Sequence, residues 1–295
     1  MKTLHHFVVG AATASLLAPL AAQTRAQTPA PPLRSGSVRF LVLGDAGTGD
    51  KSQNEVAQQM ANYRQRFPFT FAIMLGDNIY GRERPQDFEK KFERPYKPLL
   101  ESGVEFHAAL GNHDDPNQRY YKPYNLGGTR YRTFKKDNVR FFILDSNYLD
   151  PEQVQWLTKE LESSGSDWKI AYFHHPLYTT ARRGPEVELR AILEPIFVKH
   201  GVDVVFAGHE HVYERIKPQQ GIYHFTVGGA AKLRKGDTRP EPIIDARFDK
   251  DRSFLLVEIA GDSLFFQAVS RKGAVVDQGA LPRRKTGQPV PASRP

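Results

Sequence analysis

Residues 38–47 read VRFLVLGDAG, an apolar run that ends in a glycine and an aspartate. A short run of β-branched and aromatic residues predicts a buried strand, and Gly44 permits the sharp turn that would expose Asp45 at its end. Four further segments repeat this arrangement, at residues 70–80, 106–114, 169–176 and 202–211. Because open α/β sheets form their sites at the carboxyl ends of the strands, we expect the polar turns to meet in one place.

The five polar turns are GDAG at 44–47, GDNIY at 76–80, GNHD at 111–114, FHHP at 173–176 and GHEH at 208–211. Each alone is weak evidence, since a single aspartate is often a helix cap and a single histidine often part of the core. Together, each after a predicted strand, they indicate a site for two metal ions. The carboxylate of Asp77 could bridge cations about 3.5–4 Å apart, as two-metal catalysis requires.

Other side chains of these turns complete the candidate set. Tyr80 is close enough in sequence to bind a metal that Asp77 also binds, and Asn112 offers a neutral carbonyl oxygen. On an extended segment His209 and His211 point the same way. The predicted metal ligands are Asp45, Asp77, Tyr80, Asn112, His174, His209 and His211.

The first 26 residues resemble a secretory signal. Lys2 supplies the positive start, residues 7–17 are apolar, and small residues lead to cleavage points after Ala22 or Ala26. The apolar stretch is too short to span a bilayer, and no later segment is long enough. We therefore expect an exported protein, secreted or periplasmic, after removal of the signal.

Composition limits the chemistry. The chain has no cysteine, so thiolate metal sites and disulfides are excluded, and any metal must be bound by oxygen and imidazole. The net charge is +8, and loss of Lys2 and Arg25 with the signal leaves +6, which favours a small anionic substrate such as a phosphoester. Basic residues are spread along the chain, so nucleic acid is not indicated, and neither is a partner protein.

The order of elements predicts the fold. Residues 27–36 form a Pro-rich linker, residues 37–281 one domain and residues 282–295 a disordered tail. Helices are expected at 52–66, 85–100, 150–162 and 186–200, a hairpin at 131–144, and late strands at 221–227, 253–259, 263–269 and 274–280. This order fits an α/β fold in which two mixed sheets pack face to face with helices outside, a four-layer αββα sandwich with the metal site at the strand carboxyl ends.

The five motifs in this order resemble those of the calcineurin-type metallophosphoesterases, and within them the purple acid phosphatases. Many members of the wider family have a histidine two residues after the first aspartate, where this chain has Gly47. Tyr80 in GDNIY replaces it, which is the purple acid phosphatase variation, and the run GHEHVYER at 208–215 is similar to that subfamily too. Residues 27–36 leave no room for an additional N-terminal β-domain, so the chain resembles the small, single-domain, tartrate-resistant type.

The resemblance implies two metal sites that share Asp77. The first would be formed by Asp45, Asp77, Tyr80 and His211, whose hard anionic oxygens suit Fe³⁺. The second would be formed by Asp77, Asn112, His174 and His209, and it suits Fe²⁺, Zn²⁺ or Mn²⁺. The implied reaction is hydrolysis of a phosphate monoester by a metal-bound hydroxide, with His113 protonating the leaving alkoxide.

The sequence defines the substrate contacts less clearly than it defines the metal ligands. Family members often carry a further histidine in the stretch that reads TTARR at 179–183 here. Arg183 could hold phosphate bidentately in its place or could be a solvated loop charge, and both readings stay open. His175, beside His174, is the second candidate for a substrate contact.

Two other functions fit part of this evidence. A phosphodiesterase or nuclease of the same superfamily would share most of the motifs, although Tyr80 argues against it. A binding scaffold that has lost its metals would share the fold, but such scaffolds usually lack several ligands, and here all seven are present. Diester turnover and metal analysis distinguish these alternatives.

Overall fold

The computed structural model describes residues 31–284. The predicted signal, the first four residues of the predicted linker and most of the predicted tail lie outside these residues. Described structure continues past residue 281, because Pro282 is the last residue of β13 (Val275–Pro282) and the N–H of Arg283 donates to the carbonyl of Asp262. Proline lacks an N–H group, which an edge strand such as β13 tolerates.

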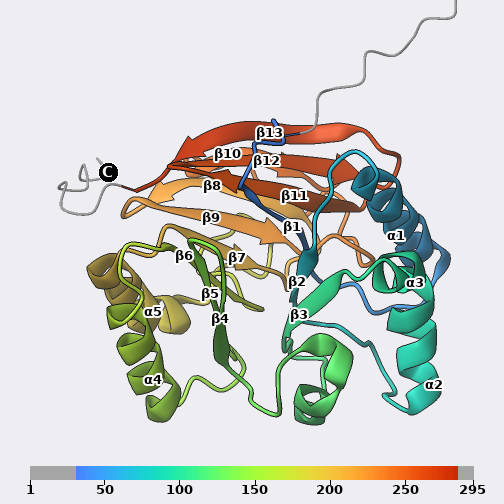
Figure 1. The fold of residues 1–295 in the computed structure, drawn as a ribbon, viewed down its shortest axis with the longest axis horizontal. Helices are drawn as coiled ribbons and strands as arrows, with labels where there is room; N and C mark the ends of the chain where they lie inside the picture. The colour runs from blue at the N-terminus through green and yellow to red at the C-terminus, as the bar shows by residue number, and fades with distance from the viewer. Residues whose placement is uncertain (1–30, 285–295) are drawn as a thin grey trace, which may run out of the picture.

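Two mixed β-sheets face each other (Figure 1). The six-stranded sheet has the order β13-β12-β11-β1-β2-β3, and the seven-stranded sheet has the order β10-β8-β9-β7-β6-β5-β4. The first contains β1 (Val38–Leu43), β2 (Phe71–Leu75), β3 (Glu105–Ala109), β11 (Ser253–Ala260), β12 (Ser263–Ser270) and β13. The second contains β4 (Arg132–Lys136), β5 (Val139–Ile143), β6 (Trp168–Phe173), β7 (Val204–Ala207), β8 (Tyr213–Gln219), β9 (Ile222–Val227) and β10 (Ile244–Phe248).

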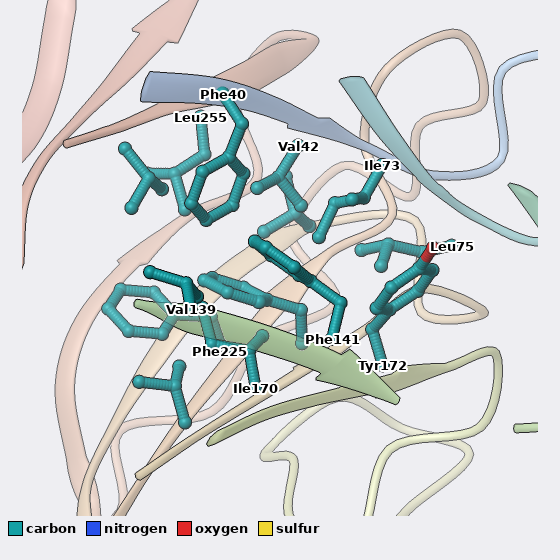
Figure 2. Packing of buried hydrophobic residues seen from close by; sticks show 14 of the residues in the cluster. Phe40, Val42, Ile73, Leu75, Val139, Phe141, Ile170, Tyr172, Phe225 and Leu255 are labelled. Carbon is teal, nitrogen blue, oxygen red and sulfur yellow. The ribbon is translucent and has the colours of Figure 1, made fainter. Parts of the chain in front are cut away.

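The alternation of side chains along each strand divides the core into layers. Phe40 and Val42 of β1 point between the sheets, where they meet Phe141, Ile170 and other residues of the second sheet (Figure 2). The ring of Phe40 lies 5.3 Å from that of Phe71 and 5.2 Å from that of Phe141. This central apolar layer fixes the two sheets face to face.

The opposite faces of the two sheets are covered by helices. On the first sheet, helix α1 (Lys51–Arg64) and the helical segment from α2 (Pro85–Phe88) to α3 (Arg94–Glu101) pack over residues such as Leu41 and Met74 (Figure 1). On the second sheet, α4 (Pro151–Glu162) and α5 (Val187–His200) cover Phe142 and Phe173. The predicted four-layer sandwich is confirmed.

Several elements differ from the sequence prediction. The helix expected at 85–100 is divided, because a π-helical turn, η1 (Glu89–Glu93), separates α2 from α3. Strands β8 and β10 were not expected, since both are rich in charged residues and lack a clear apolar alternation. Short 3₁₀ turns at Pro116–Tyr120 and Lys122–Tyr124 follow the GNHD motif.

Candidate metal centre

The polar turns of both sheets meet at the carboxyl ends of the parallel strands. Asp45, Asp77 and Asn112 follow β1, β2 and β3 of the first sheet. His174 follows β6, and His209 and His211 follow β7, in the second sheet. The candidate ligands therefore come from two separate sheets, and the packing of those sheets brings them together.

Three of these residues have unusual backbone conformations. The φ angles are +56° at Asp45, +52° at Asp77 and +66° at His209, in the left-handed region that non-glycine residues rarely adopt. Such strain persists only where surrounding structure enforces it, and it concentrates at functional sites. Here backbone N–H groups help to enforce it, since the N–H of Asp45 donates to Gly76 and that of His209 donates to the carboxylate of Asp45.

The first donor set gathers around Asp45. Its Oδ1 lies 3.1 Å from the hydroxyl oxygen of Tyr80 and 3.3 Å from Nε2 of His211, and those two atoms lie 3.3 Å from each other. A carboxylate oxygen of Asp77 lies within 4.8 Å of the donor atoms of Asp45 and His211. Four donors thus converge on one point.

The second donor set gathers around Asn112. Its Oδ1 lies 2.9 Å from Nε2 of His174 and 3.0 Å from Nδ1 of His209, and those two nitrogens are 3.1 Å apart. Asp77 again lies alongside, with Oδ1 3.4 Å from Nε2 of His174. Asp77 therefore lies adjacent to both donor sets, as a bridging ligand must.

The chemistry of the second set fits a cation. Nδ1 of the fully buried His174 lies 2.9 Å from the carbonyl of Leu75 and must donate to it, so Nε2 carries a lone pair. That lone pair faces Oδ1 of Asn112, which is also an acceptor. A hydrogen bond cannot join two acceptors, whereas a metal ion between them satisfies both, and a backbone carbonyl on the far nitrogen is the usual support of a metal-binding histidine.

Electrostatics at the first set lead to the same conclusion. Burial and the neighbouring Asp77 raise the pKa of Asp45 well above its ordinary value, and burial with both carboxylates raises the pKa of Tyr80. Clustered buried anions are costly unless a cation compensates them. Burial also lowers the pKa of His211 to about 4 and that of His209 to about 2, which keeps both imidazoles neutral and free to bind metal.

The glycine at position 47 has a steric cause. A Cβ atom there would lie 1.8 Å from the carbonyl oxygen of Asn78, so no other residue fits this backbone. The N–H of Tyr80 donates to the carbonyl of Gly47, which brings the tyrosine segment against the first motif. Glycine at position 47, where many family members have histidine, and tyrosine at position 80 are thus structurally linked.

The remaining predicted site residues border the two donor sets. The exposed ring of His113 lies 5.0 Å from the ring of Tyr80, and its N–H donates to Asp77. Nδ1 of His175 lies 2.9 Å from the hydroxyl of Ser146, and its ring lies 4.5 Å from that of His209. A guanidinium nitrogen of the exposed Arg183 lies 3.0 Å from Nε2 of His209, so this arginine reaches the second donor set from the surface.

Two supporting residues were missed by the sequence analysis. The carboxylate of Asp114 accepts from the N–H groups of Asn78, Ile79 and Gly111 and thereby ties the second motif to the third. The ammonium of Lys91, in the π-helical turn, donates to the carbonyls of Tyr80 and Arg82 at 2.7 and 2.9 Å. Asp114 stands in the GNHD motif, which was a usable signal, whereas nothing near Lys91 in sequence indicated its role.

A fold of two facing sheets whose strand ends assemble two adjoining sets of oxygen and imidazole donors defines a two-metal hydrolase. Residues 38–213 match the family described as calcineurin-like phosphoesterase. The chain belongs to this family, in its purple acid phosphatase branch. It is 30% identical to purple acid phosphatase 4 of Arabidopsis thaliana, over 79% of this chain and 80% of that protein.

Other relatives agree with this assignment. The chain is 26% identical to tartrate-resistant acid phosphatase type 5 of Rattus norvegicus, over 85% of this chain and 92% of that protein. Among solved structures, the purple acid phosphatase PPD1 of yellow lupin has a TM-score of 0.70 at 18% identity, covering 85% of this chain and 54% of that one. The predicted resemblance and the prediction of a metal-dependent phosphatase are confirmed.

The same fold also occurs in a protein with a different description. GAP50, the anchor in the inner membrane complex of Plasmodium, has a TM-score of 0.74 at 19% identity, with 85% of this chain and 90% of that chain covered. At this identity the likeness concerns the fold alone. The activity of the present chain is therefore argued from its donor sets.

Proposed function

We propose that this chain is an exported phosphatase that hydrolyses phosphate monoesters at a pair of metal ions. The observation that supports this most directly is the presence of two complete donor sets on either side of Asp77, one of which includes the hydroxyl of Tyr80. Export is supported by the signal-like pattern of residues 1–26. Within residues 31–284 no helix is long and apolar enough to cross a membrane.

The donor types favour particular metals. Two carboxylates and a phenolate in the set of Asp45, Asp77, Tyr80 and His211 favour Fe³⁺, and the more neutral set of Asp77, Asn112, His174 and His209 favours Fe²⁺, Zn²⁺ or Mn²⁺. Such a pair, when bound, neutralises phosphoryl oxygens and makes water a nucleophile at low pH.

The surrounding residues have roles that follow from their positions. The guanidinium of Arg183, held beside His209, can donate two N–H groups to a phosphoryl oxygen pair. The loop of Arg183 is itself fixed, since Glu214 accepts from the hydroxyls of Thr179 and Thr180. His113, exposed beside Tyr80, is placed to deliver a ring proton to the leaving oxygen. His175, oriented by Ser146, contacts the substrate from the opposite side.

The proposal is tested by metal analysis and turnover on one sample. We expect two metal ions per chain, including iron, and hydrolysis of p-nitrophenyl phosphate well above that of bis-p-nitrophenyl phosphate. Faster diester turnover would instead identify a phosphodiesterase or nuclease. Protein that binds no metal and hydrolyses neither compound would identify a scaffold.

A further inference from the structure

A cavity of about 450 Å³ opens beside the second donor set. Asn112 and His175 line one side of it, and the loop after β5 and the start of α5 line the rest, through Asn147, Tyr148, Glu186 and Leu189. A phosphate bound at the metal centre would direct its ester oxygen toward this space or toward solvent. The cavity is therefore the enclosed volume available to a leaving group.

The charged side chains that line this cavity are acidic, and Arg130 contacts two of the lining residues, Asp145 and Tyr148. Its lining includes the carboxylates of Asp114, Asp145 and Glu186 and neither lysine nor arginine. Asp145 is compensated by Arg130 at 2.8 Å, and Asp114 by the N–H donors of the motif turns. No ion pair within residues 31–284 compensates the exposed Glu186. Its negative charge is therefore available to a molecule that enters the cavity.

Cationic side chains that do not line the cavity border the metal centre. Arg183 lies against His209, and the ammonium of Lys232 lies 4.4 Å from the ring centre of Tyr80. The backbone N–H of Arg234 donates to the carbonyl of His211, which places a third cationic residue next to the first donor set. The centre thus has basic neighbours suited to phosphate and an acidic cavity beside it.

One neutral side chain at the cavity also suits a cation. The ring of Tyr148 is 63% exposed, and although the guanidinium carbon of Arg130 lies 5.9 Å from its centre, the exposed part of the ring can contact an ammonium group. An ammonium group in the cavity also supplies a counter-charge to Glu186.

We propose that this cavity is a leaving-group subsite for alcohols that carry an ammonium group, so that the preferred substrates are phosphate esters of small amino alcohols. This inference rests on the proposed phosphatase function and adds the class of substrate. Esters with a further phosphate in the leaving group, such as nucleoside triphosphates, are disfavoured because that phosphate would enter the acidic cavity.

The test compares phosphoethanolamine with propyl phosphate, which has nearly the same shape and no positive charge. With metal-loaded protein near pH 6 we expect kcat/KM to be about tenfold higher for phosphoethanolamine, the scale of one partly exposed charge pair. Glu186→Gln should reduce this preference at least threefold, mainly through KM. The matched control is Glu188→Gln, which removes an equal charge two residues later, in the first turn of α5, from a residue that does not line the cavity.

The possible results distinguish failure of the subsite from failure of the proposed phosphatase function. Equal turnover of the two esters by the wild type, or an equal change of preference in both variants, overturns the subsite while leaving a working phosphatase. If neither ester is hydrolysed, the proposed function fails, and the subsite is then judged by isothermal titration of both esters. Equal dissociation constants for the two esters would overturn it there.

Discussion

Nε2 of His174 and Oδ1 of Asn112 lie 2.9 Å apart with a lone pair on each. Without a cation this contact is repulsive, and with one it becomes a pair of ligand bonds. The contribution of Asn112 to stability should therefore depend on metal. We predict that Asn112→Ala lowers the Tm of the metal-loaded protein by several degrees but leaves the Tm of the chelator-treated protein unchanged or higher, measured by calorimetry. An equal loss in both states would mean that Asn112 stabilises the turn and not the metal.

Asp77 is adjacent to both donor sets, so its substitution should be more damaging than that of any other single ligand. We predict that Asp77→Asn reduces the occupancy of both metals and lowers the Tm more than Asn112→Ala does, because metal binding is coupled to folding. Metal content by mass spectrometry checks this. Full retention of one metal with loss of the other would show that Asp77 does not bridge.

Tyr80 should determine the colour of the protein. A tyrosinate bound to Fe³⁺ absorbs visible light, so aerobically purified wild type should be pink to purple, and Tyr80→Phe should be colourless while retaining its fold by circular dichroism. The substituted side chain keeps the ring that contacts His113 and Lys232, so packing changes little. A colourless wild type that contains only zinc or manganese would refute the iron assignment without refuting the phosphatase.

The effect of His113 should depend on the leaving group. An alkoxide needs a proton to leave and p-nitrophenolate does not, and loss of a general acid typically costs about 10²–10⁴-fold. We predict that His113→Ala retains its metals, loses most activity on an alkyl phosphate and loses far less on p-nitrophenyl phosphate. Equal losses on both substrates would assign His113 to phosphate binding, and His175 would become the candidate acid.

His224 should make the protein sensitive to acid. Burial lowers the pKa of this histidine to about 3, and both ring nitrogens lack a partner among the described residues. Between that value and the unfolded pKa near 6.5, the unfolded chain binds a proton that the folded chain does not, so stability falls as pH falls. We predict that His224→Leu gains on the order of 2 kcal/mol relative to wild type between pH 7 and pH 5, by urea unfolding of metal-free protein. Parallel pH dependences would refute this.

Local sequence patterns were sufficient to predict the elements whose formation depends mainly on neighbouring residues in the chain. The strands before Asp45, Asp77 and His174 are short and almost wholly apolar, and they lie where they were expected. The helix expected at 150–162 is observed at Pro151–Glu162, with Asp150 as its N-cap accepting from the N–H of Gln153. The donors at the strand ends were found for the same reason, since each follows a recognisable strand.

Features that depend on distant partners were missed. Strand β8 contains Glu214 and Arg215, which look exposed in sequence; Glu214 is buried against Thr179 and Thr180, and Arg215 pairs with Asp277 on the other sheet. Lys91 is nearly buried because its ammonium group reaches the carbonyls of Tyr80 and Arg82. A local sequence pattern cannot reveal a partner that is distant in the sequence and becomes a neighbour only in the folded protein.

Each donor set takes residues from both sheets, and this has a consequence for kinetics. A metal ion held by Asp45 and His211, or by Asn112 and His174, connects the two sheets, so it binds the packed sandwich and not the separated sheets. Removal of the ions should therefore raise the rate of global unfolding, so that the catalytic metals also determine the lifetime of the fold.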